Sequence, residues 1–418
     1  MFAVAECRPE SFEVDRRAGV VKRRVRRRDG RDSVTRVTLT QIEKGADAGA
    51  IYDQAWLRST ALPEAGGSGA RLRMADLFCG AGGFALGVDE AARALGLHVD
   101  HCLAADIEPS ALMTFRDNFR PHHSLDQPIE NHIDGDIGGR LTAAERALRK
   151  RVGEIHLVTG GPPCQGHSDL NNHTRRADPK NALYLRMARF AEVFEPETVI
   201  IENVPGVRMD RSGVFRKTLE ALQRMGYSVC DHVMEMERFG VPQRRRRVVV
   251  IATTAQVGAR AIFEGVERGY GVEPRSVKWA IGDLVDRENE TALDGVTKLS
   301  PVSKRRVDWL YDNDEYDLPN RMRPACHRLK KHSYNAVYGR LYWDQPAWTI
   351  TTGFQVMGQG RFLHPVRRRV ITSHEAARLQ FFPDYFGFRA SNRKYYAKMV
   401  GNAVPAKLAY LLALELLR

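Results

Sequence analysis

Strand-like and helix-like segments alternate between residues 72 and 252, and this alternation constrains the fold more than any other feature of the chain. Short apolar runs typical of buried strands occur at 72–78, 99–105, 155–159, 198–201, 227–233 and 247–252. Segments with the apolar spacing of helices occur at 84–95, 109–118, 183–194 and 214–225. The pattern predicts an α/β fold in which a mostly parallel, doubly wound sheet is covered by helices on both faces.

The composition favours a polyanionic partner. The chain has 418 residues and a formal net charge of +13, which makes nucleic acid the leading candidate. Its six cysteines include no Cys-x-x-Cys pair, so we expect reduced thiols and no metal site. No apolar run approaches the ~18 residues of a membrane span, and the N-terminus lacks a signal-peptide core, so we expect a cytoplasmic protein without a membrane partner.

Changes in composition divide the chain into four parts. Residues 1–70 form a basic N-terminal extension, 71–253 a large α/β domain, 254–345 a smaller and less regular domain, and 346–418 a return segment that completes the larger one. The return segment contains two predicted helices, at 374–380 and 406–417.

The N-terminal extension has a distinct composition. Its arginine-rich run Lys22–Arg28 predicts either a phosphate-binding arm or a solvated charged tail, and both alternatives remain open. Residues 34–42 alternate weakly and predict a strand or hairpin, and 65–69 read as a flexible linker.

A cysteine follows the strand predicted at 155–159, within Gly160-Gly161-Pro162-Pro163-Cys164-Gln165-Gly166. The glycines allow close approach of other groups, and the prolines stop the strand and stiffen the turn. The carboxyl ends of parallel strands are where α/β sheets place their ligands, so Cys164 is a candidate nucleophile. The alternative is a buried structural cysteine beside a turn.

A second glycine loop lies in Asp76-Leu77-Phe78-Cys79-Gly80-Ala81-Gly82-Gly83-Phe84, between a strand and a helix. Its glycines allow a cofactor to approach the backbone, and the helix offers unpaired N–H groups. Asp106 follows the next strand, where an acid suits two ribose hydroxyls. Asp136 follows a loop and is placed to reach a nucleoside base.

Polar residues also follow two later strands. Glu202 ends the strand at 198–201, and Gln243-Arg244-Arg245-Arg246-Arg247 leads into the strand at 247–252. Taken singly, Glu202 is as well explained as an ion-paired surface carboxylate, and the arginines as a solvated basic edge of the sheet. Together with Cys164 they place a thiol, a carboxyl and arginines along one rim of the sheet.

The motifs resemble, in order, those of the DNA (cytosine-5) methyltransferases. They are Phe78-x-Gly80-x-Gly82-Gly83, Pro162-Pro163-Cys164-Gln165, Glu202-Asn203-Val204, Gln243-Arg244-Arg245-x-Arg247 and Gly401-Asn402-Ala403-Val404-Pro405. The resemblance runs from about Leu72 to the C-terminus, with a gap over about 254–340. It implies a class I methyltransferase fold that uses S-adenosylmethionine and carries a target-recognition domain at 254–345.

The resemblance also implies roles for individual residues. Cys164 attacks C6 of a cytosine flipped out of the duplex, and Glu202 binds the N3 side of the ring. Arg247 corresponds to the family arginine near the cytosine O2, and Arg245 to the one that steadies the thiol and the carboxyl.

Cofactor contacts are implied at the strand ends and in the return segment: Phe78, Gly80, Gly82, Gly83, Asp106, Ile107, Asp136, Ile137, Pro162, Leu183, Asn402, Ala403 and Val404. DNA contacts are implied in the loop after Cys164 and in the basic clusters of the smaller domain: Gln165, Ser168, Lys304, Arg305, Arg306, Lys330 and Lys331.

The resemblance leaves alternatives for the substrate. Double-stranded DNA with one short recognition site is the first hypothesis, and an RNA-directed enzyme acting on tRNA is the second. A catalytically silent DNA-binding scaffold is a third, although a scaffold needs neither Cys164 nor Glu202. A zinc deaminase is excluded because Cys164 lacks the Pro-Cys-x-x-Cys partner. We expect a monomer, nucleoid-associated in a prokaryotic host, either solitary or paired with a cognate restriction endonuclease.

Overall fold

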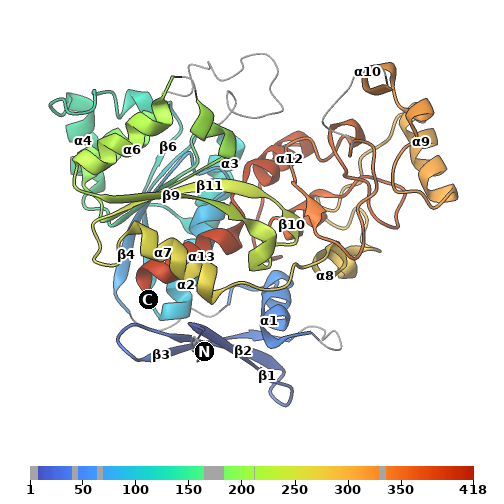
Figure 1. The fold of residues 1–418 in the computed structure, drawn as a ribbon, viewed down its shortest axis with the longest axis horizontal. Coiled ribbons are helices and arrows are strands. Elements are labelled where there is room, and N and C mark those ends of the chain that lie inside the picture. The colour runs from blue at the N-terminus through green and yellow to red at the C-terminus, as the bar shows by residue number, and fades with distance from the viewer. Residues whose placement is uncertain (1–7, 40–45, 64–68, 164–182, 211, 329–335) are drawn as a thin grey trace, which may run out of the picture.

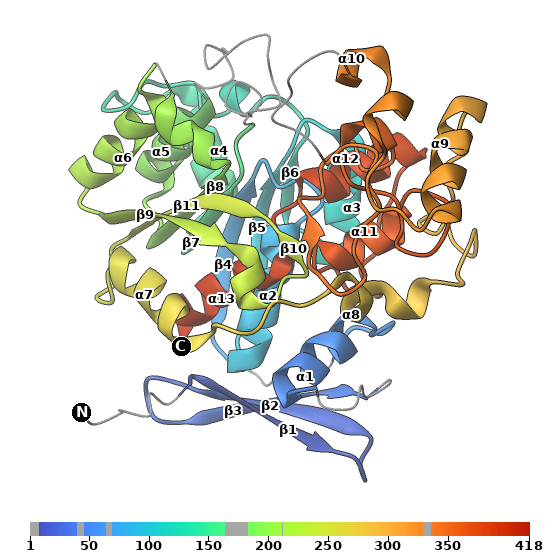
Figure 2. The same cartoon turned by 45° about the vertical axis from the view of Figure 1, so that its right-hand side comes forward.

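The structure is a computed structural model that describes residues 8–39, 46–63, 69–163, 183–210, 212–328 and 336–418. Within them, the largest sheet has seven strands in the order β6-β5-β4-β7-β8-β11-β9. The strands are β4 (Arg71–Leu77), β5 (His98–Ala105), β6 (His123–Leu125), β7 (Leu157–Gly160), β8 (Thr198–Asn203), β9 (Ser228–Glu235) and β11 (Arg246–Thr253). Figures 1 and 2 show this sheet at the centre of the larger part of the molecule.

The predicted mostly parallel sheet is confirmed except at β11. The pairs β6–β5, β5–β4, β4–β7 and β7–β8 are parallel, whereas β11 is antiparallel to both β8 and β9. Only ten residues separate β9 from β11 in the chain, and such a connection is too short for a parallel crossover. It therefore returns the chain in the opposite direction.

Helices cover both faces of the sheet, because alternate strand residues point to opposite sides. Met74, Leu157 and Val249 face the cluster formed with α2 (Gly83–Leu95), α7 (Ala259–Gly269) and α13 (Ala406–Leu417). Their strand neighbours Ala75, Val158 and Val250 face the cluster formed with α4 (Ala143–Val152), α5 (Leu183–Phe194) and α6 (Val214–Arg224). Near the sheet edge, α3 (Pro109–Phe119) adds Leu112 and Phe115 to the first cluster.

The last helix, α13, packs directly against α2, the helix that follows the first glycine loop. A Cβ atom at Gly83 would lie 2.2 Å from the carbonyl oxygen of Val404, and one at Gly87 would lie 2.3 Å from that of Ala406. The segment Arg393–Leu417, which contains α12 (Arg393–Asn402) and α13, is long and apolar enough to cross a membrane, although no such run was expected from the sequence. However, 78% of its most apolar stretch is buried inside the fold.

The N-terminal extension is folded onto the larger domain. Strands β1 (Glu10–Asp15), β2 (Val20–Arg26) and β3 (Asp32–Thr38) form an antiparallel sheet, and α1 (Ala48–Leu57) packs against it. Val21, Val25 and Trp56 belong to the same buried cluster as α2 and α13. Arg27 donates to the carbonyl oxygen of Leu95 at the end of α2, so this sheet lies at the end of the domain opposite Gly83 (Figures 1 and 2).

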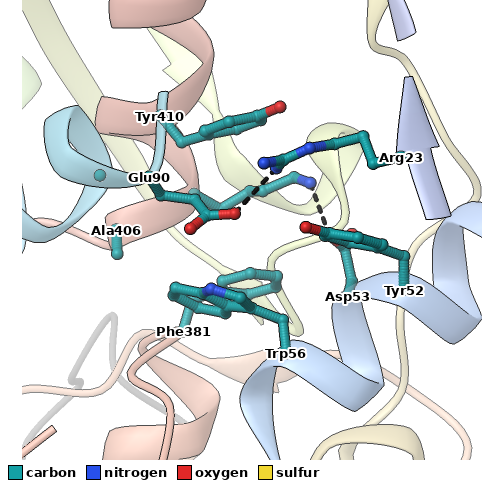
Figure 3. A pocket seen from close by; sticks show the side chains of 10 residues that line it. Arg23, Tyr52, Asp53, Trp56, Glu90, Phe381, Ala406 and Tyr410 are labelled. Carbon is teal, nitrogen blue, oxygen red and sulfur yellow. Dashed lines mark hydrogen bonds and ion pairs between the residues drawn. The ribbon is translucent and has the colours of Figure 1, made fainter. Parts of the chain in front are cut away.

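The arginine-rich run Lys22–Arg28 is not a free tail, because most of it forms strand β2, although Arg24 and Arg26 are exposed on that strand. Its phosphate binding stays a prediction. Arg23 is buried, with its guanidinium 2.9 Å from the carboxylate of Glu90 on α2 and between the rings of Tyr52 and Tyr410 (Figure 3). Arg28 donates to the carbonyl oxygen of Glu415 at 2.9 Å. These cations attach the extension to the domain.

A buried polar network joins the N-terminal extension to the larger domain around a small cavity of about 20 Å³. Lys407 on α13 lies 2.7 Å from the carboxylate of Asp53 on α1, and Tyr410 donates to Glu10 on β1. Burial raises the pKa of Glu10 against the opposing effects of Lys407 and Arg23. Since buried charges are costly unless paired, removal of one partner here should destabilise the protein.

A smaller buried cluster lies outside the main core. It contains Val307 and Leu310 from α9 (Pro301–Asp312), with Leu318, Val337 and Leu363 from the segments that follow. By contrast, α7 and α8 (Val277–Ile281) contribute to the main core, although the smaller domain was predicted to begin at residue 254. Figure 1 shows α9 and α10 (Ala325–Arg328) at the side of the molecule away from α4 and α6.

We predict that Arg23→Ala lowers the free energy of unfolding by about 3–5 kcal/mol, because it leaves Glu10 and Glu90 buried beside fewer cations. Urea unfolding followed by circular dichroism measures this change. The matched control is Arg24→Ala, one position along the same strand, where the arginine is exposed and its pairing with Asp32 is worth at most about 1 kcal/mol. Equal effects of the two substitutions would contradict the anchoring role of Arg23.

Candidate active site

The carboxyl ends of four parallel strands meet at one edge of the sheet. Leu77 pairs with both Ala105 and Gly160, and Gly160 pairs with Ile201. The loops that follow β4, β5, β7 and β8 therefore leave the sheet side by side. These loops carry the glycine loop, Asp106, the Pro162-Pro163 turn and Glu202, which confirms that the fold brings the predicted motifs to one edge.

The glycine loop after β4 is held by Asp106. One carboxylate oxygen of Asp106 accepts a hydrogen bond from the Gly80 N–H, and the other accepts one from the Glu108 N–H, both at 2.8 Å. The loop turns through left-handed backbone at Phe78, Gly80 and Gly82, with φ of 54°, 54° and 98°. Burial raises the pKa of Asp106, and each of its carboxylate oxygens can accept a further hydrogen bond.

Three predicted cofactor residues from different segments border one apolar cluster. Phe78, Ile137 and Leu183 are partly buried against the core on the α5 side of the sheet. Ile107 is 64% exposed and Asp136 is also exposed, so both side chains are accessible to a ligand.

The return segment closes the same region from the other side. Ala403 and Val404 are buried, Asn402 is exposed, and the Val404 carbonyl lies against the position of Gly83 at the start of α2. This contact brings the Asn402-Ala403-Val404 motif beside the glycine loop, as the resemblance predicted.

Glu202 forms a buried ion pair beside the turn that precedes Cys164. Its carboxylate lies 2.7 Å from the Arg247 guanidinium across the antiparallel β8–β11 pair. A Cβ atom at Gly161 would lie 3.6 Å from the same carboxylate. Asn203 donates to the carbonyl oxygen of Pro162 at 3.0 Å, which fixes the turn against β8. The predicted residues Cys164, Gln165 and Ser168 lie outside the described residues.

Arg245 immediately precedes β11 and is fully buried. It donates to the carbonyl oxygens of Ile350 at 2.8 Å and Ala403 at 3.1 Å. These contacts tie the return segment to the strand that carries Arg247. The predicted steadying of thiol and carboxyl by Arg245 remains an inference from the family.

The basic clusters predicted to contact DNA differ in their surroundings. Arg305 is exposed, and Lys304 is exposed with an ion pair to Asp308 at 2.7 Å on the same helix. Arg306 donates to the carbonyl oxygen of Met322 and lies over the Tyr338 ring, so it contributes to the smaller core. Lys330 and Lys331 lie outside the described residues.

Sequence reasoning assigned no role to two glutamines that support this edge. Gln243 donates to Gln380 at 2.9 Å and accepts from the Ile350 N–H at 2.8 Å, and Gln380 donates to the Val400 carbonyl oxygen at 2.6 Å. Both are fully buried. The only signal in the sequence was Gln243, a glutamine within an otherwise basic run. The partners of Gln243 are more than a hundred residues away in the chain, and Gln380 bonds to a residue of another helix.

The buried carboxyl of Asp76 was also missed. It faces Thr159 across the β4–β7 pair, beneath the glycine loop, and burial raises its pKa to about 7. An aspartate inside the apolar run Leu72–Phe78 was the signal in the sequence.

Comparison with solved structures identifies the fold class first. The fold resembles the crystal structures of a putative DNA modification methyltransferase from an Escherichia coli prophage (TM-score 0.56, 23% identity, 82% of this chain and 98% of that one) and of the Schizosaccharomyces pombe Dnmt2 methyltransferase (TM-score 0.55, 20% identity, 83% and 98%). The architecture is therefore the Rossmann-like fold of methyltransferases, as predicted.

Sequence comparison then identifies the family. Residues 72–418 match the C-5 cytosine-specific DNA methylase model, and the chain belongs to this family. It is 44% identical to the Type II methyltransferase M1.BsuMI of Bacillus subtilis, over 98% of this chain and 95% of that protein. It is 31% identical to the Type II methylase M.HgiDII of Herpetosiphon aurantiacus, over 82% and 94%. The protein is a DNA (cytosine-5-)-methyltransferase.

We predict that Asp76→Asn stabilises the protein increasingly as pH rises from 5 to 8. The folded-state pKa of about 7 lies above the ordinary 3.8, so ionisation of Asp76 costs stability progressively between pH 4 and 7. Over pH 5–8 the difference in free energy of unfolding should move in the variant's favour by about 2–3 kcal/mol. Urea unfolding at each pH measures it, with the exposed Asp126→Asn as control. Parallel pH curves for Asp76→Asn and wild type would refute the prediction.

Proposed function

We propose that the enzyme transfers a methyl group from S-adenosylmethionine to C5 of a cytosine flipped out of a short, specific duplex DNA site, through a covalent adduct with Cys164. The observation that supports this most is the Glu202–Arg247 pair, buried at 2.7 Å beside Gly161, three residues before Cys164. A carboxyl and a guanidinium that lie this close together can bind neighbouring positions on one edge of a pyrimidine ring.

The chemistry explains why these groups are needed together. The Cys164 thiolate adds to C6, and Glu202 donates a hydrogen bond or proton at N3 while Arg247 binds O2, so the ring's electron pair becomes available at C5. S-adenosylmethionine supplies the methyl group that C5 accepts. Loss of the C5 proton to a base then restores the double bond and expels the thiolate. A single difficult substitution is thus divided into easier steps.

The cofactor pocket proposed for this chain fits a nucleoside. Asp106 is fixed by two N–H donors and would accept from the ribose hydroxyls, while the exposed Asp136 would accept from the adenine amino group. Phe78, Ile107 and Ile137 would pack on the adenine, and Leu183 and Pro162 would border it. The glycines Gly80, Gly82 and Gly83 leave room for the methionine end beside Asn402, Ala403 and Val404.

Recognition of the DNA sequence is assigned to the smaller domain. Its separate core and the exposed Lys304 and Arg305 on α9 support this assignment. The relatives named as Type II enzymes support a role beside a restriction endonuclease, in which methylation protects host DNA. We keep the monomer and the cytoplasmic, nucleoid-associated location as expectations of the same proposal.

We predict that Cys164→Ser abolishes methyl transfer, because a hydroxyl is a far weaker nucleophile than a thiolate, while S-adenosylmethionine binding stays within about twofold of wild type. Bisulfite sequencing of DNA from cells that express each chain measures the product, and calorimetry measures cofactor binding. Methylcytosine at one recurring motif should appear with wild type alone. Turnover by Cys164→Ser would remove this residue from the mechanism.

Methylation of tRNA with no methylation of DNA by the wild type would instead favour the RNA-directed alternative. Cofactor binding without methylation of either nucleic acid would favour the silent scaffold.

We also predict that exchange of residues 286–345 for the matching segment of M.HgiDII moves methylation to the site of that relative. The exchange retains α7 and α8, which belong to the main core, and replaces much of the smaller core. Bisulfite sequencing again identifies the site, and cofactor binding by the chimera shows that it is folded. A folded, active chimera that keeps the original site would place recognition elsewhere in the chain.

A further inference from the structure

The loop that carries Asp136 is held by side chains from two helices. Arg186 of α5 donates to the carbonyl oxygens of Ile133 at 3.0 Å and Gly135 at 2.7 Å. The Gly135 N–H donates to Glu145 of α4 at 2.9 Å. Both backbone groups of Gly135 are thus engaged immediately before Asp136.

The backbone that follows Asp136 is also held by side chains of α5. The Gly138 N–H donates to the two carboxylate oxygens of Glu192 at 2.9 and 3.1 Å. Arg189 donates to the carbonyl oxygens of Gly139 at 3.0 Å and Arg140 at 3.1 Å. The backbone is therefore fixed on both sides of Asp136 and Ile137, although Asp136 itself is exposed.

These side chains form one charged cluster. Arg189 makes a two-point contact with Glu145, at 2.8 and 2.6 Å, and a third contact with Glu192 at 2.6 Å. Arg189 and Glu145 are completely buried, while the side chain of Glu192 is 25% exposed. Two-point guanidinium–carboxylate contacts have a strict geometry. The cluster therefore fixes the position of the loop.

Glycine at position 135 permits this arrangement. A Cβ atom there would lie 2.5 Å from an Arg189 nitrogen and 2.8 Å from a Glu145 oxygen. The cluster thus reaches the loop backbone at the residue before Asp136.

We propose that Glu192, Arg189 and Glu145 are positioning residues that set how strongly the enzyme prefers adenine over a purine without the 6-amino group. They act through the loop backbone, by holding the Asp136 carboxylate where the amino group would be recognised. This inference rests on the proposed function, in which Asp136 accepts from that amino group. A hydrogen bond discriminates well only when its acceptor is held in place, because a mobile acceptor loses entropy on binding.

The test compares two probes with the full-length protein by calorimetry. One is S-adenosylhomocysteine, and the other is the same molecule with hydrogen in place of the 6-amino group. We expect wild type to prefer the first by about tenfold or more, as for a lost hydrogen bond to a charged acceptor. Glu192→Ala should reduce the preference to about two- to threefold and leave the affinity for the probe without the 6-amino group nearly unchanged.

Two further variants complete the design. Glu197→Ala is the matched control, because this nearby glutamate is exposed and its side chain should not affect the preference. Glu192→Gln keeps an acceptor for the Gly138 N–H and should retain an intermediate preference, which also provides a test if Glu192→Ala fails to fold.

The outcomes separate the positioning role from the proposed function. Full preference in folded Glu192→Ala, or equal weakening of both probes, overturns the positioning role while cofactor binding by wild type still stands. No binding of either probe by wild type overturns the proposed cofactor. Equal wild-type binding of both probes overturns the role of Asp136, and the positioning role with it.

Discussion

The close contact between the first helix of the methyltransferase domain and the end of the chain is the constraint on which the rest depends. Gly83 and Gly87 bring α2 so near to Val404 and Ala406 that side chains at these positions would overlap the opposing backbone. The glycine loop at the start of α2 and the Asn402-Ala403-Val404 motif therefore adjoin, although more than three hundred residues separate them in the chain. The proposed cofactor pocket takes its walls from both ends of the domain and therefore depends on this contact.

Buried polar groups extend that constraint to the catalytic rim. Arg245, Gln243 and Gln380 donate to backbone carbonyls of the return segment, and Arg247, two residues after Arg245, pairs with Glu202. One short segment thus carries the buried Arg245, which holds the return segment, and Arg247, which pairs with Glu202. Since each buried donor needs its acceptor, a displacement of the return segment would leave several groups unpaired, and this cost keeps the rim in one arrangement.

Positive charge has two different uses in this chain. At the N-terminus it anchors a three-stranded sheet to α2 and α13, at the end of the domain opposite the site. The likeness to M1.BsuMI covers 98% of this chain and so extends into this region, whereas the family model begins at residue 72. On α9, by contrast, Lys304 and Arg305 are exposed, and Lys304 pairs with Asp308 on the same helix. Net charge alone predicted the partner correctly but did not distinguish these two roles.

Local sequence patterns determined six of the seven strands of the main sheet, the helices α2, α3, α5 and α6, the glycine loop and the acids at the strand ends, but they missed β6 and α4. The predicted helix at 84–95 and strand at 99–105 agree with α2 and β5 to within one residue, because apolar periodicity and Gly96 act within a few positions. Only the tertiary structure decided the folding of the arginine-rich run and the cluster around Asp136. Arg23 lies in a buried strand because Glu90 pairs with it, and Gly135 is held because Arg189 and Glu145 reach it. Such contacts join residues distant in the chain, so no local pattern contains them.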